Sequence, residues 1–170
     1  MTRNVASPRV RGFGTSVFSE MSRLATQHGA VNLGQGFPDF PGPSFVKEAA
    51  KAAIDADLNQ YAVSYGAPRL RAAIASTWNE QYGMDVDPDR EITVTSGATE
   101  AIFDVVQALA GPGDEIVVFE PFYDSYLPSA IMASATMRTI RLRPPDWSFD
   151  PEEAAAAFGP RTRVLLLNTP

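Results

Sequence analysis

The sequence predicts an α/β fold with a mostly parallel sheet. From residue 91 onward, short apolar segments alternate with segments of helical periodicity in the order β-α-β-α-β-α-β, which is typical of a parallel sheet covered by helices. The last apolar run, residues 164–167, is continuous, as in a strand buried on both faces. With 170 residues, of which 45% are hydrophobic and 20% charged, the chain can bury a core.

The first half of the chain is predicted to hold helices separated by ordered loops. Apolar residues recur at helical spacing after Ser16, a suitable N-cap, and Gly29 is placed to end this first helix. The segment after the first helix is rich in Pro and Gly, which excludes regular structure there, and the segment after the second is a tyrosine-bearing loop. The expected helices cover residues 16–28, 44–57 and 68–83, and the expected loops cover residues 31–43 and 58–66.

The second half is predicted to be a series of short strands and helices. An apolar or β-branched run predicts each strand, helical periodicity predicts each helix, and residues 111–114 (Gly-Pro-Gly-Asp) predict a turn. The expected strands are residues 92–95, 115–119, 137–142 and 163–168, and the expected helices are residues 98–109, 123–133 and 151–158.

The composition excludes several classes of function. With 14 Lys and Arg against 20 Asp and Glu, the net charge of −6 argues against a general nucleic-acid or anionic-membrane binder. The absence of cysteine excludes disulfides, a thiol nucleophile and thiolate metal sites, and the single histidine, His28, excludes sites built on two; no metal is expected. No apolar run approaches the roughly 18–20 residues of a membrane span, and the first residues lack the apolar region of a secretory signal. A cytoplasmic protein is therefore expected.

The C-terminal run predicts that the chain is a fragment. A domain rarely ends on a central strand, because chain termini usually lie at the surface. Here the sequence stops at Pro170, just past the apolar residues 164–167. The alternative is a natural C-terminal strand.

Residues 31–43 contain the motif Gly34-Gln35-Gly36, which begins like a dinucleotide-binding fingerprint. Position 39 is Asp instead of Gly, and Pro38 and Pro41 prevent a helix from starting there, so that interpretation fails. A rigid connector is the simpler interpretation, and spacing alone favours it. The functional alternative is a loop whose glycines let backbone N–H groups approach a ligand.

Residues 96–100 (Ser-Gly-Ala-Thr-Glu) lie between a predicted strand and a predicted apolar helix. Accessible N–H groups at a helix start, together with the helix dipole, attract a phosphate or carboxylate. In open α/β sheets, ligands also bind at the carboxyl ends of strands. Simple capping of the helix by Ser96 explains the same residues equally well. No lysine follows the glycine, so the motif is not a P-loop.

Residues 120–126 (Glu-Pro-Phe-Tyr-Asp-Ser-Tyr) follow the next predicted strand at the same sheet edge. An aromatic side chain there can stack on a flat ligand ring, or it can form a hydrophobic lid over the sheet end. The lid is the more common case, and two such loops on neighbouring strand ends add some support to the ligand alternative.

Together these segments resemble the pyridoxal-phosphate-dependent class I/II aminotransferases of fold type I. The resemblance extends to the kynurenine, glutamine and methionine aminotransferases and to the N-succinyldiaminopimelate aminotransferases. It covers about residues 16–170, with the motifs in family order. The residues that carry it are 31–40, 59–61, 65–66, 70–71, 95–101, 112–115, 120–126 and 168–170.

The resemblance implies an architecture and a set of cofactor contacts. Residues 1–45 would form an N-terminal arm and a small-domain segment, and residues 46–170 the first part of a three-layer α/β/α large domain that binds the cofactor. Pyridoxal 5′-phosphate (PLP) is the implied cofactor. Backbone groups of Gly97, Ala98 and Thr99 would contact its phosphate, and Tyr123 would stack on its pyridine ring.

Further implied roles concern the substrate and a second subunit. Tyr61 would reach the phosphate of the neighbouring subunit, which implies a homodimer with shared active sites. Gly36 would meet the substrate carboxylate through its backbone, and Phe18 would line the side-chain pocket. The implied substrates are an amino acid and a 2-oxo acid.

The sequence departs from the family pattern in one respect that bears on activity. This chemistry needs a lysine that forms a Schiff base with the cofactor. The only lysines are Lys47 and Lys51, both on an early helix and neither in the family's Ser-x-x-Lys context. No catalytic residue is therefore assigned within the chain, and the 170 residues alone are expected to be inactive.

Three functions remain open at this stage. The full-length protein would be an aminotransferase that moves an amino group between an amino acid and a 2-oxo acid. A PLP-dependent cysteine-conjugate β-lyase would use the same site with a similar N-terminal half. A catalytically inert fragment, motivated by the missing lysine, is the third alternative.

Overall fold

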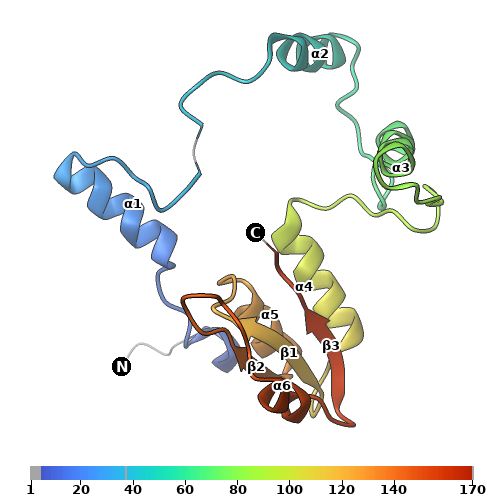
Figure 1. Cartoon of the computed structure of the whole chain (residues 1–170). Helices are drawn as coiled ribbons and strands as arrows, with labels where there is room; N and C mark the ends of the chain where they lie inside the picture. Colours follow the sequence, from blue (N-terminus) through green and yellow to red (C-terminus); the bar gives the residue numbers. More distant parts are fainter. Residues whose placement is uncertain (1–4, 37, 170) are drawn as a thin grey trace. The chain divides into compact units, whose positions relative to one another are not determined.

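The computed structural model describes residues 5–36 and 38–169 (Figure 1). The chain divides into two compact units. One unit combines the residues up to Ser19 with those from Ser96 onward, and the other is Glu20–Thr95. These units are defined by contacts within the chain and do not test the predicted division into domains at residues 1–45 and 46–170, which stays a prediction.

A parallel sheet forms the centre of the unit that contains Ser96 and the following residues. Its strands are β1 (Glu115–Glu120), β2 (Thr136–Arg141) and β3 (Thr162–Leu166), in the spatial order β2-β1-β3. Glu115 of β1 pairs with Thr136 of β2 and with Thr162 of β3, so the three strands start at one edge and run in one direction. Around the sheet lie η1 (Pro8–Val10), α4 (Ala98–Leu109), α5 (Tyr126–Ala133) and α6 (Pro151–Ala157).

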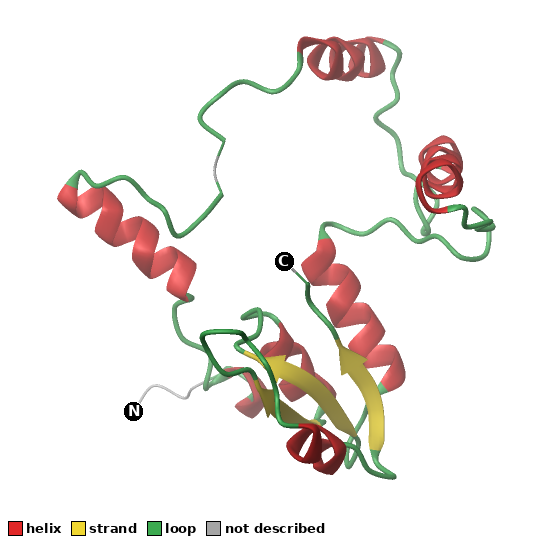
Figure 2. Ribbon diagram, in the orientation of Figure 1, coloured by secondary structure: helices red, strands yellow, loops and turns green. Residues whose placement is uncertain are grey.

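Helices cover both faces of the sheet, as the ribbon in Figure 2 shows. On one face, Ile116 and Val118 of β1 pack in a buried cluster with Val106 of α4 and Ala130 of α5. On the other, Val117 packs with residues of β2 and α6. Burial of each such aliphatic side chain contributes about 1.5–3 kcal/mol. The predicted α/β class, with a parallel sheet between two helical layers, is confirmed.

The Glu20–Thr95 unit is built from helices and ordered loops. α1 (Val17–His28) begins in the first unit, where the N–H of Ser19 donates to Ser16 Oγ at 3.2 Å, and Gly29 follows it in a left-handed conformation. Both observations confirm the predicted ends of this helix. The other helices are α2 (Ser44–Asp55) and α3 (Pro68–Tyr82), which also match the sequence predictions closely. No helix in the described part of the chain is long and apolar enough to cross a membrane.

Two sequence predictions of secondary structure are wrong. Residues 92–95 form no strand: the N–H of Val94 donates to the Tyr65 carbonyl at 3.0 Å, but no ladder with a neighbouring strand forms within the described residues. A β-branched run needs such a ladder to become a strand. The second helix of this half, α5, begins at Tyr126 and not at residue 123, because the segment after β1 first passes through a turn.

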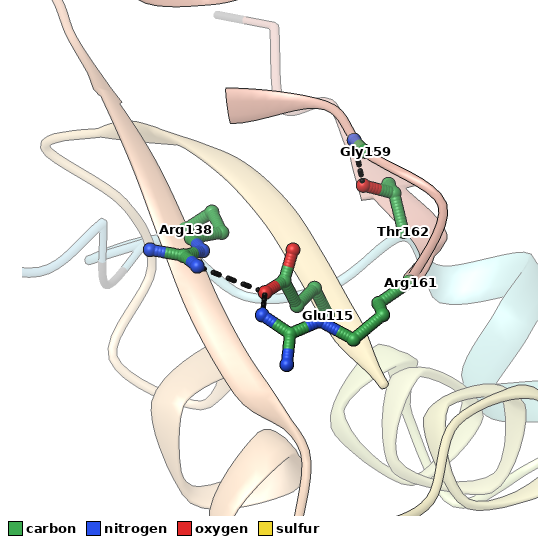
Figure 3. Close-up of polar contacts among 5 residues, drawn as sticks. All are labelled: Glu115, Arg138, Gly159, Arg161 and Thr162. Carbon is green, nitrogen blue, oxygen red and sulfur yellow. Dashed lines mark hydrogen bonds and ion pairs between the residues drawn. The ribbon is translucent and has the colours of Figure 1, made fainter. Parts of the chain in front are cut away.

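A buried carboxylate closes the edge of the sheet at which the strands begin (Figure 3). Glu115 is only 6% exposed, and its Oε1 accepts from Arg138 Nη2 at 2.9 Å and from Arg161 Nη2 at 2.6 Å. These two arginines come from β2 and from the turn before β3, so one carboxylate links all three strands. The hydrogen bond from Arg138 is the main cause that holds the pKa of Glu115 below its ordinary value, against the opposing effect of burial.

We expect Glu115→Gln to lower the melting temperature (Tm) of the chain by several degrees at pH 7, because both arginines lose a charged partner. A carboxyl whose folded pKa is lowered stabilises the fold above its ordinary pKa of 4.5, and this contribution disappears as the pH falls through the folded pKa. The Tm difference between wild type and variant should therefore narrow below about pH 4. Circular-dichroism melts between pH 7 and pH 3 measure it.

The matched control is Glu48→Gln, which breaks an exposed ion pair to Lys51 at 2.8 Å on α2. Exposed pairs of this kind contribute little, so its Tm should stay near that of the wild type. Equal Tm values for the two variants at pH 7 would contradict the role given to Glu115.

Candidate functional site

The candidate site lies where β1 ends and α4 begins. β1 ends at Glu120, and Tyr123 and Asp124 follow in the turn before α5. In a parallel sheet the carboxyl ends of the strands form one edge, and ligands bind there. Thr99 in the first turn of α4 lines the same surface depression as Asp124, so both loops singled out in the sequence meet at this edge.

The start of α4 has the geometry of an anion-binding site. Gly97 is the N-cap, with φ 84° and ψ 169°, a conformation that is almost restricted to glycine. The first-turn N–H groups of Ala98 and Thr99 have no acceptor inside the helix, as at every helix start, and a glycine N-cap has no side chain that could supply one. A Cβ built on Gly97 would meet no atom within 4 Å, which leaves open space beside these groups.

Glu100 has a local role that the sequence analysis did not assign. Its carboxylate accepts a hydrogen bond from the N–H of Ser96, across the first turn of the helix. A carboxylate at the third position of a helix commonly reaches back in this way. The N-cap is Gly97, so the alternative in which Ser96 caps the helix is not what the structure shows.

The depression beside α4 has a volume of about 610 Å³. Ser125 Oγ lies on it as a buried oxygen with no hydrogen-bond partner among the described residues. Buried hydroxyls are normally paired, so this oxygen has unused bonding capacity. In the sequence, Ser125 belongs to the motif of residues 120–126 but has no assigned role. Its burial, which singles it out, is visible only in the structure. The depression is lined by Ser96, Thr99, Glu100, Phe103, Asp124, Ser125, Pro128, Ser129 and Met132.

An aromatic cluster lies at the same end of the unit. Tyr123 is 44% exposed, so part of its ring remains open to solvent. Its centroid lies 6.0 Å from the ring of Phe18 and 6.0 Å from that of Tyr126, and Tyr126 in turn stacks on Phe122. Phe18 and Tyr123, which the sequence assigned to different roles, are therefore neighbours. The supporting ring of Tyr126 was not predicted.

The remaining predicted site residues lie in the Glu20–Thr95 unit, and their roles stay predictions. Tyr61 is fully exposed. Gly36 is also exposed, in a loop that side-chain contacts tie to α1. In that loop, Asn32 Nδ2 donates to Ser22 Oγ of α1 at 3.1 Å, and Ser22 Oγ donates to Gln35 Oε1 at 3.1 Å.

Neither lysine lies in the unit that holds the candidate site. Lys47 and Lys51 are both exposed on α2, and Lys51 pairs with Glu48. Within residues 5–36 and 38–169, no group of three or more His, Asp or Glu side chains is arranged to hold a metal ion. The site as built offers backbone donors, hydroxyls and aromatic rings, and no amine nucleophile.

The model of the family described as aminotransferase class I and II matches residues 28–170. The chain belongs to this family. The resemblance found in the sequence is thus confirmed, and members of the family use PLP.

Individual relatives match over nearly the whole chain. A probable N-succinyldiaminopimelate aminotransferase, DapC, of Mycobacterium tuberculosis is 48% identical over 164 residues, which are 95% of this chain and 41% of that protein. Human kynurenine–oxoglutarate transaminase 1 is 39% identical over 183 residues, covering 100% of this chain and 43% of its own length. The crystal structure of an Escherichia coli protein with a methionine aminotransferase function has a TM-score of 0.89 at 40% identity, covering 96% of this chain and 43% of that one. The chain therefore spans less than half the length of these relatives.

Gly97 gives a test of the site's backbone geometry. We expect Gly97→Ala to destabilise the chain by about 1–3 kcal/mol, because a Cβ is strained at this φ and ψ. Urea unfolding measures the loss. The control is Gly111→Ala, at a glycine outside the left-handed region where the Cβ would approach only Asp114 Oδ2 at 4.0 Å. Equal stabilities of the two variants would contradict the conformation at Gly97.

Proposed function

We propose that the whole protein containing this chain is a PLP-dependent aminotransferase, which moves an amino group from an amino acid to a 2-oxo acid. The observation that carries the proposal is the start of α4, where the N-cap is a glycine with open space beside it. Membership of the aminotransferase family supports it. The amino acid, the 2-oxo acid and a cytoplasmic location are parts of the same proposal.

The residues of the chain fit such a cofactor in two respects. The N–H groups of Gly97, Ala98 and Thr99 would hold its phosphate, since a helix start favours an anion through its donors and its dipole. The partly open ring of Tyr123, supported by Tyr126, would stack on the pyridine ring. When bound, PLP supplies the electron sink that stabilises the carbanion of the substrate.

Two residues would orient the substrate. The backbone of Gly36 would meet its carboxylate, and Phe18, beside Tyr123, would line the pocket for its side chain. An apolar pocket distinguishes substrates that differ by one methylene by only about 1–3 kcal/mol. Phe18 would therefore contribute to selection without deciding it alone.

A second subunit is part of the proposal. Tyr61 would reach the cofactor phosphate of a neighbouring copy, so the protein would be a homodimer with shared active sites. The full exposure of this tyrosine supports a role outside its own unit. Exposed tyrosines with one apolar and one polar end are common in interfaces.

We also propose that the 170-residue chain alone does not catalyse the reaction. Its only lysines are the exposed Lys47 and Lys51 of α2. After incubation with PLP and reduction with borohydride, the whole protein should gain one pyridoxyl group on one lysine. The chain alone should gain no such single-site adduct. Intact mass followed by peptide mapping measures both.

Substrate assays on the whole protein test the reaction itself. Mixing the holoprotein with single amino acids should change its cofactor absorbance, and a 2-oxo acid should reverse the change. Pyruvate released from a cysteine conjugate without a 2-oxo acid would favour the β-lyase alternative. No spectral change with any amino acid would contradict the proposed function.

The phosphate contact is tested by Ala98→Pro. Proline suits the first position of a helix, so the fold should keep its Tm, while one N–H donor is lost. Loss of a hydrogen bond to a charged group costs about 1.5–3 kcal/mol, which predicts at least tenfold weaker PLP binding by the whole protein. Binding of pyridoxal, which lacks the phosphate, should not change. Ala98→Ser keeps the N–H and is the control, and equal PLP affinities of the two variants would contradict the contact.

A further inference from the structure

Arg71 is a buried charged residue that the proposed function leaves without a role. It lies in the first turn of α3, within the Glu20–Thr95 unit, and is 6% exposed. Among the described residues, only Glu115 is a charged side chain buried to the same degree. Burial of a guanidinium is unfavourable unless hydrogen bonds and an opposite charge compensate for the lost water.

The partners of Arg71 come from two segments of the chain. Its Nε donates to the carbonyl of Gly66 at 3.2 Å. Its Nη1 donates to the carbonyl of Pro88 and pairs with Asp89 Oδ1 at 3.1 Å. One rigid guanidinium therefore joins the end of the loop before α3 to the turn after it. A lysine has no such fork of donors.

The loop that Arg71 holds is fixed on its other side as well. Gly66 has φ 100°, and a Cβ built on it would lie 2.6 Å from the Cβ of Val94. Next to it, the carbonyl of Tyr65 accepts from the N–H of Val94 at 3.0 Å. The N–H of Gly66 also donates to the carbonyl of Val63 at 2.8 Å, which closes a tight turn. Gly66 is thus a fixed point of the backbone.

Tyr61 lies five residues before Gly66. Its ring is fully exposed in its own unit, so the backbone that carries it sets its direction, and packing does not. That backbone enters the turn at Val63 and is anchored at Gly66 by Arg71. If the anchor loosens, the position of Tyr61 becomes less well defined.

We infer that Arg71 is a positioning residue for Tyr61: its hydrogen bond to Gly66 fixes the loop that presents the tyrosine to the cofactor phosphate of a neighbouring subunit. The inference rests on the proposed function. It predicts that Arg71 affects recognition of the phosphate group, and does so through Tyr61.

The test compares PLP and pyridoxal binding to the whole apoprotein. Tyr61→Phe should weaken PLP binding about tenfold, since it removes one hydrogen bond to an anion, and should leave pyridoxal binding within about twofold. Arg71→Lys should lower the ratio of PLP to pyridoxal affinity about threefold to tenfold in the wild-type background and have no further effect in the Tyr61→Phe background. Loss of fold stability alone would lower both affinities equally.

Ile74→Ala is the matched control, because it removes a half-buried side chain from the same helix. It should lower the Tm and leave the affinity ratio unchanged. If Arg71→Lys also leaves the ratio unchanged while Tyr61→Phe lowers it, the inference is overturned and the proposed function stands. Additive effects in the double variant would overturn it too. If Tyr61→Phe has no effect on PLP binding, both the Tyr61 contact and the inference are wrong.

Should Arg71→Lys fail to fold, Asp89→Asn replaces it. Asp89 is largely exposed, and its substitution removes only the carboxylate that pairs with Arg71 Nη1. We expect a lowering of the affinity ratio of about twofold that disappears in the Tyr61→Phe background. An unchanged ratio in this variant would overturn the inference.

Discussion

Burial of β1 on both faces is the constraint on which the rest of the sheet unit depends. Ile116, Val117 and Val118 are 0% exposed, and β1 pairs with a parallel strand on each side. Consecutive side chains of a strand point to opposite faces, so three buried residues in a row require apolar layers above and below. Helices α4 and α5 supply one layer and α6 the other. Because both faces are covered, polar groups around β1 lie at the edge where the strands begin or at the edge where they end.

The two ends of β1 differ in how their polar groups are paired. At its start, Glu115 is neutralised by two arginines, so that edge is closed and its charges are satisfied. At its end, Glu120 leads into aromatic residues, and the neighbouring helix α4 begins with N–H groups that have no acceptor in the helix. The ion pairs of Glu115 lie at one edge, and backbone donors without an acceptor in their helix lie at the other. Under the proposed function, a ligand at the second edge would bind without disturbing the ion pairs at the first.

Much of this arrangement follows from local sequence. Apolar periodicity, Ser16, Gly29 and the proline at the start of α3 predict the helices, since caps and helix periods depend only on near neighbours. The predicted strand over residues 92–95 failed because a strand depends on a partner that lies elsewhere in the chain. Arg71 and Glu115 were missed for the same reason: their partners lie up to 46 residues away in sequence, and nothing local marks them as buried. The two loops of the site were found, but their shared depression required the fold.

The small residues at the start of α4 can be found in the sequence, but the sequence alone does not show whether they bind an anion or only cap the helix. A phosphate held by main-chain N–H groups needs no particular side chain, only residues that keep the main chain accessible and a glycine that tolerates φ 84°. Ordinary helix capping uses similar residues, so the motif alone leaves both interpretations open. In the structure the N-cap is Gly97, which has no side chain, and the space beside it is open. Under the proposed function, recognition of the anion would depend on backbone conformation. A substitution that removes only one N–H group would then test it more directly than removal of any side chain.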